Sequence, residues 1–304
     1  MSDTDTTSSA RRSALAAAVR WRLPFSRRAW RGLAGNWTGA GAGSSLDFQD
    51  HRNYLPGDDP RHIHWQAFAR TGALTMKLYR AEVAPFVDLA VDISGSMALT
   101  PEKRARTDEL VAFCVECADR AGAPVRIHAA QGRTLRAITA DEVRTGKWRE
   151  RIELADTTAA KTKAAPAPAP ESAVAPGPFP WRPGAMKVLI SDLLYPGDPS
   201  SLLIPLAGGA GVGLVLAPTL VDEADLPWRG NVELTDCESG TMRRQRIDEA
   251  LAARYRAAYA RHFALWREAC RKRGLLFARV PAEGTLVHAL GGEAFAAGAI
   301  ESTA

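Results

Sequence analysis

Two apolar runs that each lead to an aspartate constrain the fold of this chain more than any other feature. Residues 86–91 (Phe-Val-Asp-Leu-Ala-Val) precede Asp92, and residues 186–190 (Met-Lys-Val-Leu-Ile) precede Ser191 and Asp192. Short runs of this kind are typical of strands that are covered on both faces of a sheet. The sequence therefore predicts a buried sheet in which two strands end near a carboxylate.

The segments around these runs alternate between helical and strand-like periodicity. Helices are expected at residues 101–121, 141–154, 199–207 and 243–273, and further strands at residues 125–129, 135–138, 213–217, 231–235 and 275–279. This alternation predicts an α/β fold with a mostly parallel sheet and helices on both faces. Because ligands of such sheets bind beyond the carboxyl ends of the strands, Asp92 and Asp192 are the natural site candidates.

We divide the chain into four parts. Residues 1–36 are interpreted as a disordered tail and a basic amphipathic segment, residues 37–82 as a small β-rich extension, residues 83–290 as the α/β domain, and residues 291–304 as a C-terminal tail. Within the domain, residues 159–178 are rich in Ala and Pro and are expected to form a disordered insertion. Residues 11–31 hold seven arginines and no acid. They predict either a helix lying on the domain or a contact with an anionic membrane surface or an acidic partner.

The composition argues against several classes of protein. A net charge of +5 over 304 residues, with no basic block on a reading motif, does not indicate a nucleic-acid binder. Four cysteines are too few for a disulfide scaffold, and Cys114 and Cys117 lie mid-helix on an apolar stripe that favours packing over redox chemistry. We see neither a signal peptide nor an apolar stretch of membrane-spanning length, so we expect a cytoplasmic protein.

The loop after the first apolar run carries the candidate chemistry. Asp92, Ser94 and Ser96 offer one carboxylate and two hydroxyls at alternate positions, and Gly95 allows the backbone to bend between them. Hard cations such as Mg²⁺ prefer oxygen ligands, and Asp192 supplies a second carboxylate at a neighbouring strand end. The pattern favours a divalent metal site; the simpler alternative is an Asp-Ser turn that caps the following helix.

This D-x-S-x-S loop, followed by S-D after a later strand, resembles the metal-ion-dependent adhesion site of von Willebrand factor A domains. The resemblance implies a von Willebrand factor A-like, Rossmann-type domain. It also implies that Asp92, Ser94 and Ser96 bind the ion directly or nearly so, and that Asp192 binds it through water. A further threonine usually completes this pattern. Thr157 or Thr158 is the candidate, although no segment beside them matches the usual threonine loop.

A second resemblance covers the extension. Residues 48–70 follow the pattern F-x-x-x-R-x-Y-x-P-G-D-D-x-R-x-I-D-W-x-x-x-A-R, with His64 standing where the pattern has Asp. This resembles the signature of a large bacterial family known as domain of unknown function fifty-eight, and the resemblance runs from about residue 37 to residue 290. Members commonly accompany MoxR-type AAA+ ATPases, in systems thought to remodel or mature other proteins. The polar residues of the signature are interpreted either as a partner-docking or site-supporting loop or as a network that fixes the extension to the domain; they are Arg52, Tyr54, Asp58, Asp59, Arg61 and Arg70.

These patterns lead to one functional hypothesis and two alternatives. We expect a metal-dependent protein-binding module, without enzyme activity, that acts with a MoxR-type ATPase. The first alternative is a haloacid-dehalogenase-like phosphatase with Asp92 as nucleophile and Asp192 with Asp198 as its late acidic motif. Ser94 stands where its proton donor is needed, and we find no well-placed lysine between the two motifs. The second alternative is a peripheral membrane adaptor that binds through residues 11–31.

Overall fold

A six-stranded sheet forms the centre of the computed structural model, which describes residues 3–27, 30, 32–132, 134–153, 179–195, 197–238 and 240–303. The strand order is β11-β8-β7-β4-β5-β6, and every neighbouring pair is parallel except β5 with β6. The strands are β4 (Val87–Asp92), β5 (Val125–Gln131), β6 (Thr134–Ile138), β7 (Met186–Ile190), β8 (Val212–Thr219) and β11 (Leu276–Pro281). The predicted mixed α/β fold with a mostly parallel sheet is confirmed.

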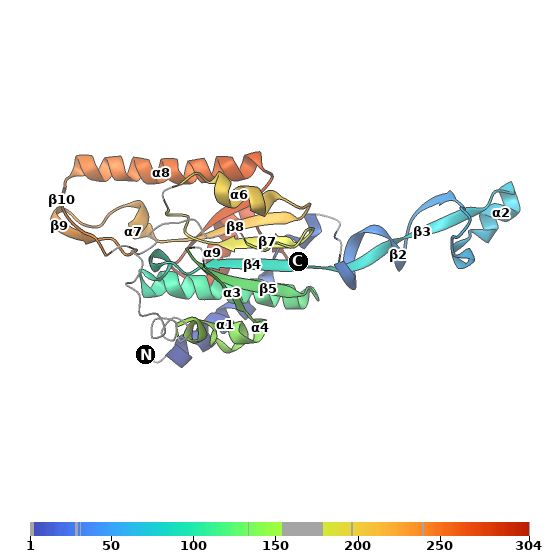
Figure 1. The fold of residues 1–304 in the computed structure, drawn as a ribbon, viewed down its shortest axis with the longest axis horizontal. Coiled ribbons are helices and arrows are strands. Elements are labelled where there is room, and N and C mark those ends of the chain that lie inside the picture. Colours follow the sequence, from blue (N-terminus) through green and yellow to red (C-terminus); the bar gives the residue numbers. More distant parts are fainter. Residues whose placement is uncertain are drawn as a thin grey trace.

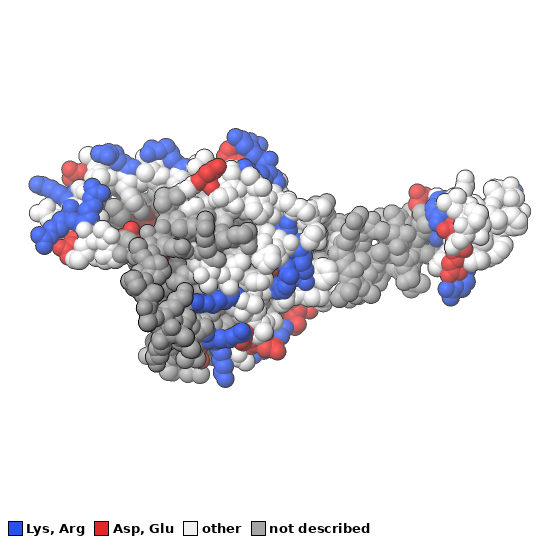
Figure 2. Space-filling view, in the orientation of Figure 1, with Lys and Arg blue, Asp and Glu red and all other residues white. Residues whose placement is uncertain are grey.

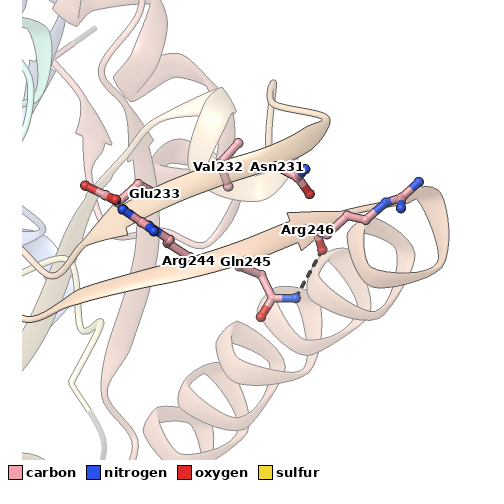
Figure 3. A pocket seen from close by; sticks show the side chains of 6 residues that line it. All are labelled: Asn231, Val232, Glu233, Arg244, Gln245 and Arg246. Carbon is pink, nitrogen blue, oxygen red and sulfur yellow. Dashed lines mark hydrogen bonds and ion pairs between the residues drawn. The ribbon is translucent and has the colours of Figure 1, made fainter.

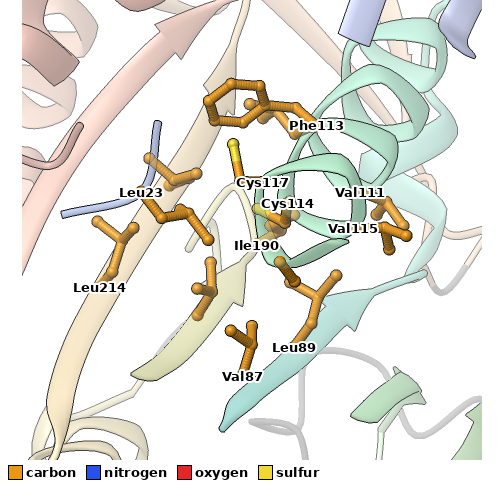
Figure 4. Packing of buried hydrophobic residues seen from close by; sticks show 14 of the residues in the cluster. Leu23, Val87, Leu89, Val111, Phe113, Cys114, Val115, Cys117, Ile190 and Leu214 are labelled. Atoms are coloured by element: carbon orange, nitrogen blue, oxygen red, sulfur yellow. The ribbon is translucent and has the colours of Figure 1, made fainter. Parts of the chain in front are cut away.

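Helices cover both faces of this sheet (Figure 1). One face carries α3 (Pro101–Arg120) and the other carries α8 (Glu249–Lys272) and α6 (Ser200–Ala207). Shorter helices are α4 (Ala140–Thr145), η3 (Gly95–Ala98), α7 (Val221–Ala224), α9 (Leu286–Ala289) and η4 (Leu290–Ala294). Figure 4 shows side chains of β4 and α3, among them Leu89, Phe113 and Cys117, packed in the core on the α3 side. Cys114 and Cys117 are both buried there, where burial raises the pKa of each thiol.

Residues near both ends of the described chain pack against this core, and the N-terminal segment forms the helix lying on the domain that is one of the two alternatives predicted for it. Helix α1 (Asp3–Arg20) contacts α3, and its buried face is a stripe of alanines: Ala14, Ala17 and Ala18. After it, β1 (Trp21–Arg22) pairs with β12 (Glu301–Ser302). The short alanine side chains allow close contact between the two helices. Because alanine is only weakly hydrophobic, this buried face is hard to recognise in the sequence. This alanine face packs inside the protein, while the side chains of Arg11, Arg12 and Arg20 are exposed. In the part of the chain described, no helix is long and apolar enough to cross a membrane.

The extension is a long β-hairpin arm. Strands β2 (Gly32–Asn53) and β3 (Thr75–Pro85) pair antiparallel, and η2 (Pro60–His62) and α2 (Trp65–Thr71) lie at the tip. The arm leaves the domain at the amino end of β4 and projects away from it (Figure 1). Its tip is therefore remote from the carboxyl ends of the sheet strands.

The helix predicted over residues 243–273 is instead a strand followed by a helix. β10 (Met242–Ile247) pairs with β9 (Gly230–Thr235) in a separate two-stranded hairpin. Asp248 then ends the strand, because its side chain accepts the backbone N–H of Leu251 and caps α8. The insertion at residues 159–178 and both candidate threonines, Thr157 and Thr158, lie outside the described residues.

Candidate functional site

The loop after β4 brings its carboxylate and hydroxyls together as the sequence predicts. Asp92 Oδ1 accepts the backbone N–H of Ser94 at 2.9 Å, and Asp92 Oδ2 accepts the hydroxyl of Ser191 at 2.8 Å. The Oγ atoms of Ser94 and Ser96 lie 3.2 Å apart. Asp92 is only 9% exposed, so the loop sits at the edge of the core with its oxygens held in place.

Asp192 follows the neighbouring strand β7 and is also buried. Its Oδ1 accepts the backbone N–H of Leu194 at 3.1 Å. Burial and, next, the charge of Asp192 raise the pKa of Asp92 to about 6, although the hydrogen bonds from Ser94 and Ser191 lower it. The two aspartates are thus close enough to repel each other, which is the arrangement that a bound cation stabilises.

A lysine stands between the two motifs, so the prediction that none is well placed there is wrong. Lys103, in the first turn of α3, places Nζ 2.6 Å from Asp192 Oδ2 and 2.5 Å from Glu223 Oε1. Its side chain is fully buried. Burial opposes the charge of Lys103, but the carboxylates of Asp192 and Glu223 outweigh that effect and raise its pKa. The amphipathic pattern of α3 does not indicate that Lys103 is buried. It also carries no signal that Lys103 contacts a residue at the end of another strand.

An acidic residue from the β9–β10 turn completes the surroundings of the loop. Glu238 Oε1 accepts the backbone N–H of Ser96 at 2.8 Å, across 142 positions of sequence. The turn lies against Gly95, where an added Cβ would come within 2.6 Å of the Cys237 carbonyl oxygen. Sequence reasoning missed Glu238 because no local motif marks it.

The donor set fits a hard divalent cation. Among the described residues, no group of three or more His, Cys, Asp or Glu side chains is arranged to hold a metal, so the site depends on hydroxyl oxygens. Adjacent ligands of an octahedral Mg²⁺ lie about 3.0 Å apart when each is about 2.1 Å from the ion. The 3.2 Å between the Ser94 and Ser96 hydroxyls matches this spacing with little movement.

The charge of the cluster also fits a cation. The carboxylates of Asp92, Asp192 and Glu238 lie at or beside the loop and that of Glu223 joins them through Lys103, which is the cation that pairs with this cluster among the described residues. With every group ionised, these five side chains sum to −3. Lys103 forms ion pairs with Asp192 and Glu223. The Asp92 carboxylate has no cationic partner among the described residues.

The signature residues lie at the tip of the arm and not at this site. Arg52 binds Asp58 through two nitrogens at 2.8 and 2.5 Å, and Arg61 binds Asp59 at 2.6 Å. The interpretation of these residues as a loop that supports the metal site is therefore wrong. So is the interpretation as a network that fixes the extension to the domain, because both ion pairs stay within the arm.

The remaining signature positions have local roles in the arm. The backbone N–H of Tyr54 donates to the Leu74 carbonyl, and Arg70 is exposed on α2. His64 stacks on His51 with ring centroids 4.8 Å apart, and burial lowers its pKa. The departure from the family pattern at this position thus produces a ring stack. Trp65 and Phe68 leave an exposed aromatic surface beside it.

Comparisons with known proteins place the chain in a family without assigning it an activity. Residues 50–265 match the profile of the family described as protein of unknown function DUF58. Uncharacterized proteins of Mycobacterium bovis and Mycobacterium tuberculosis are 31% identical over 241 residues, which is 76% of this chain and 73% of theirs. Two solved structures align over 70% of this chain and 98% of their own length, each with a TM-score of 0.33. They are the conserved hypothetical protein BatB of Bacteroides thetaiotaomicron, at 17% identity, and an aerotolerance-related membrane protein of Bacteroides fragilis, at 16%.

Proposed function

Because this chain belongs to the family of proteins of unknown function DUF58, we propose its function from the geometry of the Asp92 loop. The protein is a metal-dependent protein-binding module whose domain is of the von Willebrand factor A type. It works with a MoxR-type AAA+ ATPase in the remodelling or maturation of other proteins. The observation that carries this proposal is the pair of serine hydroxyls 3.2 Å apart beside the buried, poorly compensated carboxylate of Asp92.

Mg²⁺ would be held by Asp92, Ser94 and Ser96, with Asp192 close enough to act through water. When bound, the ion supplies a positive charge that attracts a carboxylate from a partner. The chain's own residues fix the loop backbone through the hydrogen bond from the Ser94 backbone N–H to Asp92, and the Ser191 hydroxyl fixes the Asp92 carboxylate. The loop lies at the carboxyl ends of the strands, which is the edge where parallel sheets bind their ligands.

The site favours binding over catalysis. A phosphatase with Asp92 as nucleophile needs a proton donor at position 94, and Ser94 cannot serve as that acid. Lys103 supplies a buried cation that such an enzyme would use, but its ammonium is committed to Asp192 and Glu223. Both Asp92 oxygens accept hydrogen bonds from within the chain, which lowers their nucleophilicity.

Calorimetric titration tests the metal step. Mg²⁺ titrated into the full-length protein should bind the wild type, and binding should be lost in Asp92→Ala and reduced at least tenfold in Ser96→Ala. Ser201→Ala, which removes an exposed hydroxyl on α6, is the matched control and should bind as the wild type. Equal binding by all four proteins, or by none, contradicts the proposed site.

A second measurement tests the partner step. The MoxR-type ATPase from the same organism should bind the wild type in Mg²⁺ and release it in EDTA. Asp92→Ala should behave in Mg²⁺ as the wild type behaves in EDTA. Complex formation that is indifferent to both treatments removes the metal from the binding mechanism.

A further inference from the structure

The β9–β10 hairpin reaches back over the metal-site loop and presents a carboxylate to it. Glu238 Oε1 accepts the backbone N–H of Ser96, the residue whose hydroxyl belongs to the candidate ligand set. Two hydrogen bonds to Asp236 hold the described residues on either side of the turn tip. Asp236 Oδ1 accepts the backbone N–H of Glu238 at 2.8 Å, and the Asp236 carbonyl accepts that of Gly240 at 2.8 Å. Glu238 is therefore held at the loop by a structured turn.

This contact places the Glu238 carboxylate at the backbone of the loop that carries the candidate ligands. Gly95 admits the turn, because a side chain there would meet the Cys237 carbonyl oxygen at 2.6 Å. The backbone of the turn thus lies in close contact with the loop at Gly95. Among the described residues, the Glu238 carboxylate is hydrogen-bonded to the loop through one bond, from the Ser96 backbone N–H. Such a contact is specific in position but weak enough to be displaced.

The outer surface of the same hairpin is basic. Arg243, Arg244 and Arg246 are exposed on β10, and Figure 2 shows Lys and Arg side chains gathered at this end of the molecule. Arg244 pairs with Glu233 at 3.0 Å with most of its side chain in solvent, and Figure 3 shows the two beside a hollow on the hairpin. Arg243 and Arg246 form no ion pair with the residues that the structure describes. This surface therefore attracts an acidic segment to the vicinity of the loop.

We infer that the β9–β10 hairpin is a displaceable cover of the Asp92 loop, in which Glu238 serves as an internal carboxylate ligand that an acidic segment of a protein partner replaces. This inference rests on the proposed function, because it names the regulation of the same site. The arginines of β10 guide the acidic segment, and the partner's carboxylate then competes with Glu238. A tethered competitor acts at an effective concentration in the millimolar range, so its removal strengthens partner binding without adding any contact.

The first experiment tests the contact without metal. Hydrogen exchange of a peptide that contains Ser96 is measured in full-length protein with EDTA. Glu238→Ala should expose the Ser96 amide and accelerate its exchange at least tenfold. Asp222→Ala, which removes an exposed carboxylate of α7 at the same end of the sheet, should exchange as the wild type. Unchanged exchange in Glu238→Ala overturns the cover.

The second experiment tests competition. A fluorescein-labelled peptide of alternating Glu and Gly is titrated in Mg²⁺, and its binding is followed by fluorescence anisotropy. Glu238→Ala should bind it about tenfold more tightly than the wild type, and Asp222→Ala should match the wild type. The double variant Arg243→Gln, Arg246→Gln should bind at least threefold more weakly, with a reduced dependence on salt.

The outcomes separate this inference from the proposed function. If Mg²⁺ binds the wild type but Glu238→Ala leaves peptide affinity unchanged, the cover is overturned and the metal site stands. If no protein binds Mg²⁺, the proposed function fails and this inference fails with it.

Discussion

The ammonium of Lys103 lies 2.6 Å from the Asp192 carboxylate, so a fully buried side chain of α3 is tied to the end of β7. The same ammonium reaches Glu223 of α7, and Glu223 Oε2 accepts the backbone N–H of Leu220 at 3.0 Å. One cation thus joins three elements around the candidate site. Its position beside the Asp92 loop makes the stability of the site and of the fold interdependent.

Lys103→Met should be strongly destabilising. Removing the ammonium leaves the Asp192 and Glu223 carboxylates buried without their partner, and breaking a buried ion pair in this way costs about 3–5 kcal/mol. Urea unfolding measures the change in free energy. Lys147→Met, at an exposed position, should shift it by less than about 0.5 kcal/mol. A similar small loss in Lys103→Met would show that the ion pair contributes little.

Asp92→Asn should stabilise the metal-free protein at neutral pH. The folded state raises the pKa of Asp92 to about 6, chiefly by burial, so the unfolded chain releases this proton at lower pH. Stability therefore falls as pH rises from about 4 to about 6 and stays low above that range. The penalty is on the order of 2 to 3 kcal/mol, and the asparagine variant does not incur it.

Thermal unfolding in EDTA at several pH values measures this effect. Asp92→Asn should gain stability over the wild type at pH 7.5 and lose that advantage near pH 4. Asp222→Asn is the control, because its carboxylate is exposed. Added Mg²⁺ should stabilise the wild type alone. A wild type and an Asp92→Asn variant with the same pH profile would contradict the raised pKa.

The sheet could be predicted from the sequence because its strands are apolar runs of strand length. The strand ends at Asp92 and Asp192 follow from the same periodicity. A helix lying on the domain is one of the alternatives that the N-terminal segment predicts, but the burial of its alanine face could not be predicted, because alanines among arginines give a weak apolar pattern. Pairing of β1 with β12 joins residues at opposite ends of the chain, and local periodicity carries no signal of such a contact.

The candidate site was predictable only where its residues are local. Asp92, Ser94 and Ser96 form one short loop, so their spacing indicates their chemistry. Lys103 and Glu238 reach the site from positions that are 89 residues from Asp192 and 142 residues from Ser96, respectively. Charged residues at such separations are indistinguishable in sequence from solvated surface residues. Their roles depend on the tertiary fold.

The protein should not hydrolyse phosphate esters. Ser94 provides no general acid, and Lys103 is held by two carboxylates away from a substrate. Release of p-nitrophenol from its phosphate ester, assayed with Mg²⁺, should not exceed the background of Asp92→Asn. Turnover by the wild type that disappears in Asp92→Asn would instead establish the phosphatase alternative.

Arg52→Ala should loosen the arm tip without unfolding the domain. The Asp58 carboxylate accepts hydrogen bonds from two nitrogens of Arg52 and from the backbone N–H of Leu55. The change therefore removes the principal partner of this carboxylate. Hydrogen exchange should accelerate within residues 50–77, while the melting temperature of the domain remains the same. Arg70→Ala, on the exposed face of α2, is the matched control and should leave exchange in the tip unchanged. A lower melting temperature in Arg52→Ala would show that the arm is coupled to the core.

Gly95→Ala should lift the β9–β10 turn from the loop by steric means alone. Its added Cβ would lie 2.6 Å from the Cys237 carbonyl oxygen. This oxygen belongs to the backbone, which cannot move aside as easily as the end of a flexible side chain. We expect a loss of about 1–3 kcal/mol in stability, together with faster exchange of the Ser96 amide. Gly208→Ala is the control, because an added Cβ there would be in ordinary van der Waals contact, at 3.5 Å or more, and its backbone is extended (φ −66°, ψ 161°).

The double variant Gly95→Ala, Glu238→Ala shows whether the two residues act on one contact. If both changes detach the same turn, the second change has little left to remove. The double variant then loses less stability than the sum of the losses in the two single variants. Urea unfolding of the wild type, both single variants and the double variant measures this difference. Losses that are fully additive would mean that Gly95 and Glu238 act independently. The close backbone approach would then have no part in holding the carboxylate of Glu238 at Ser96.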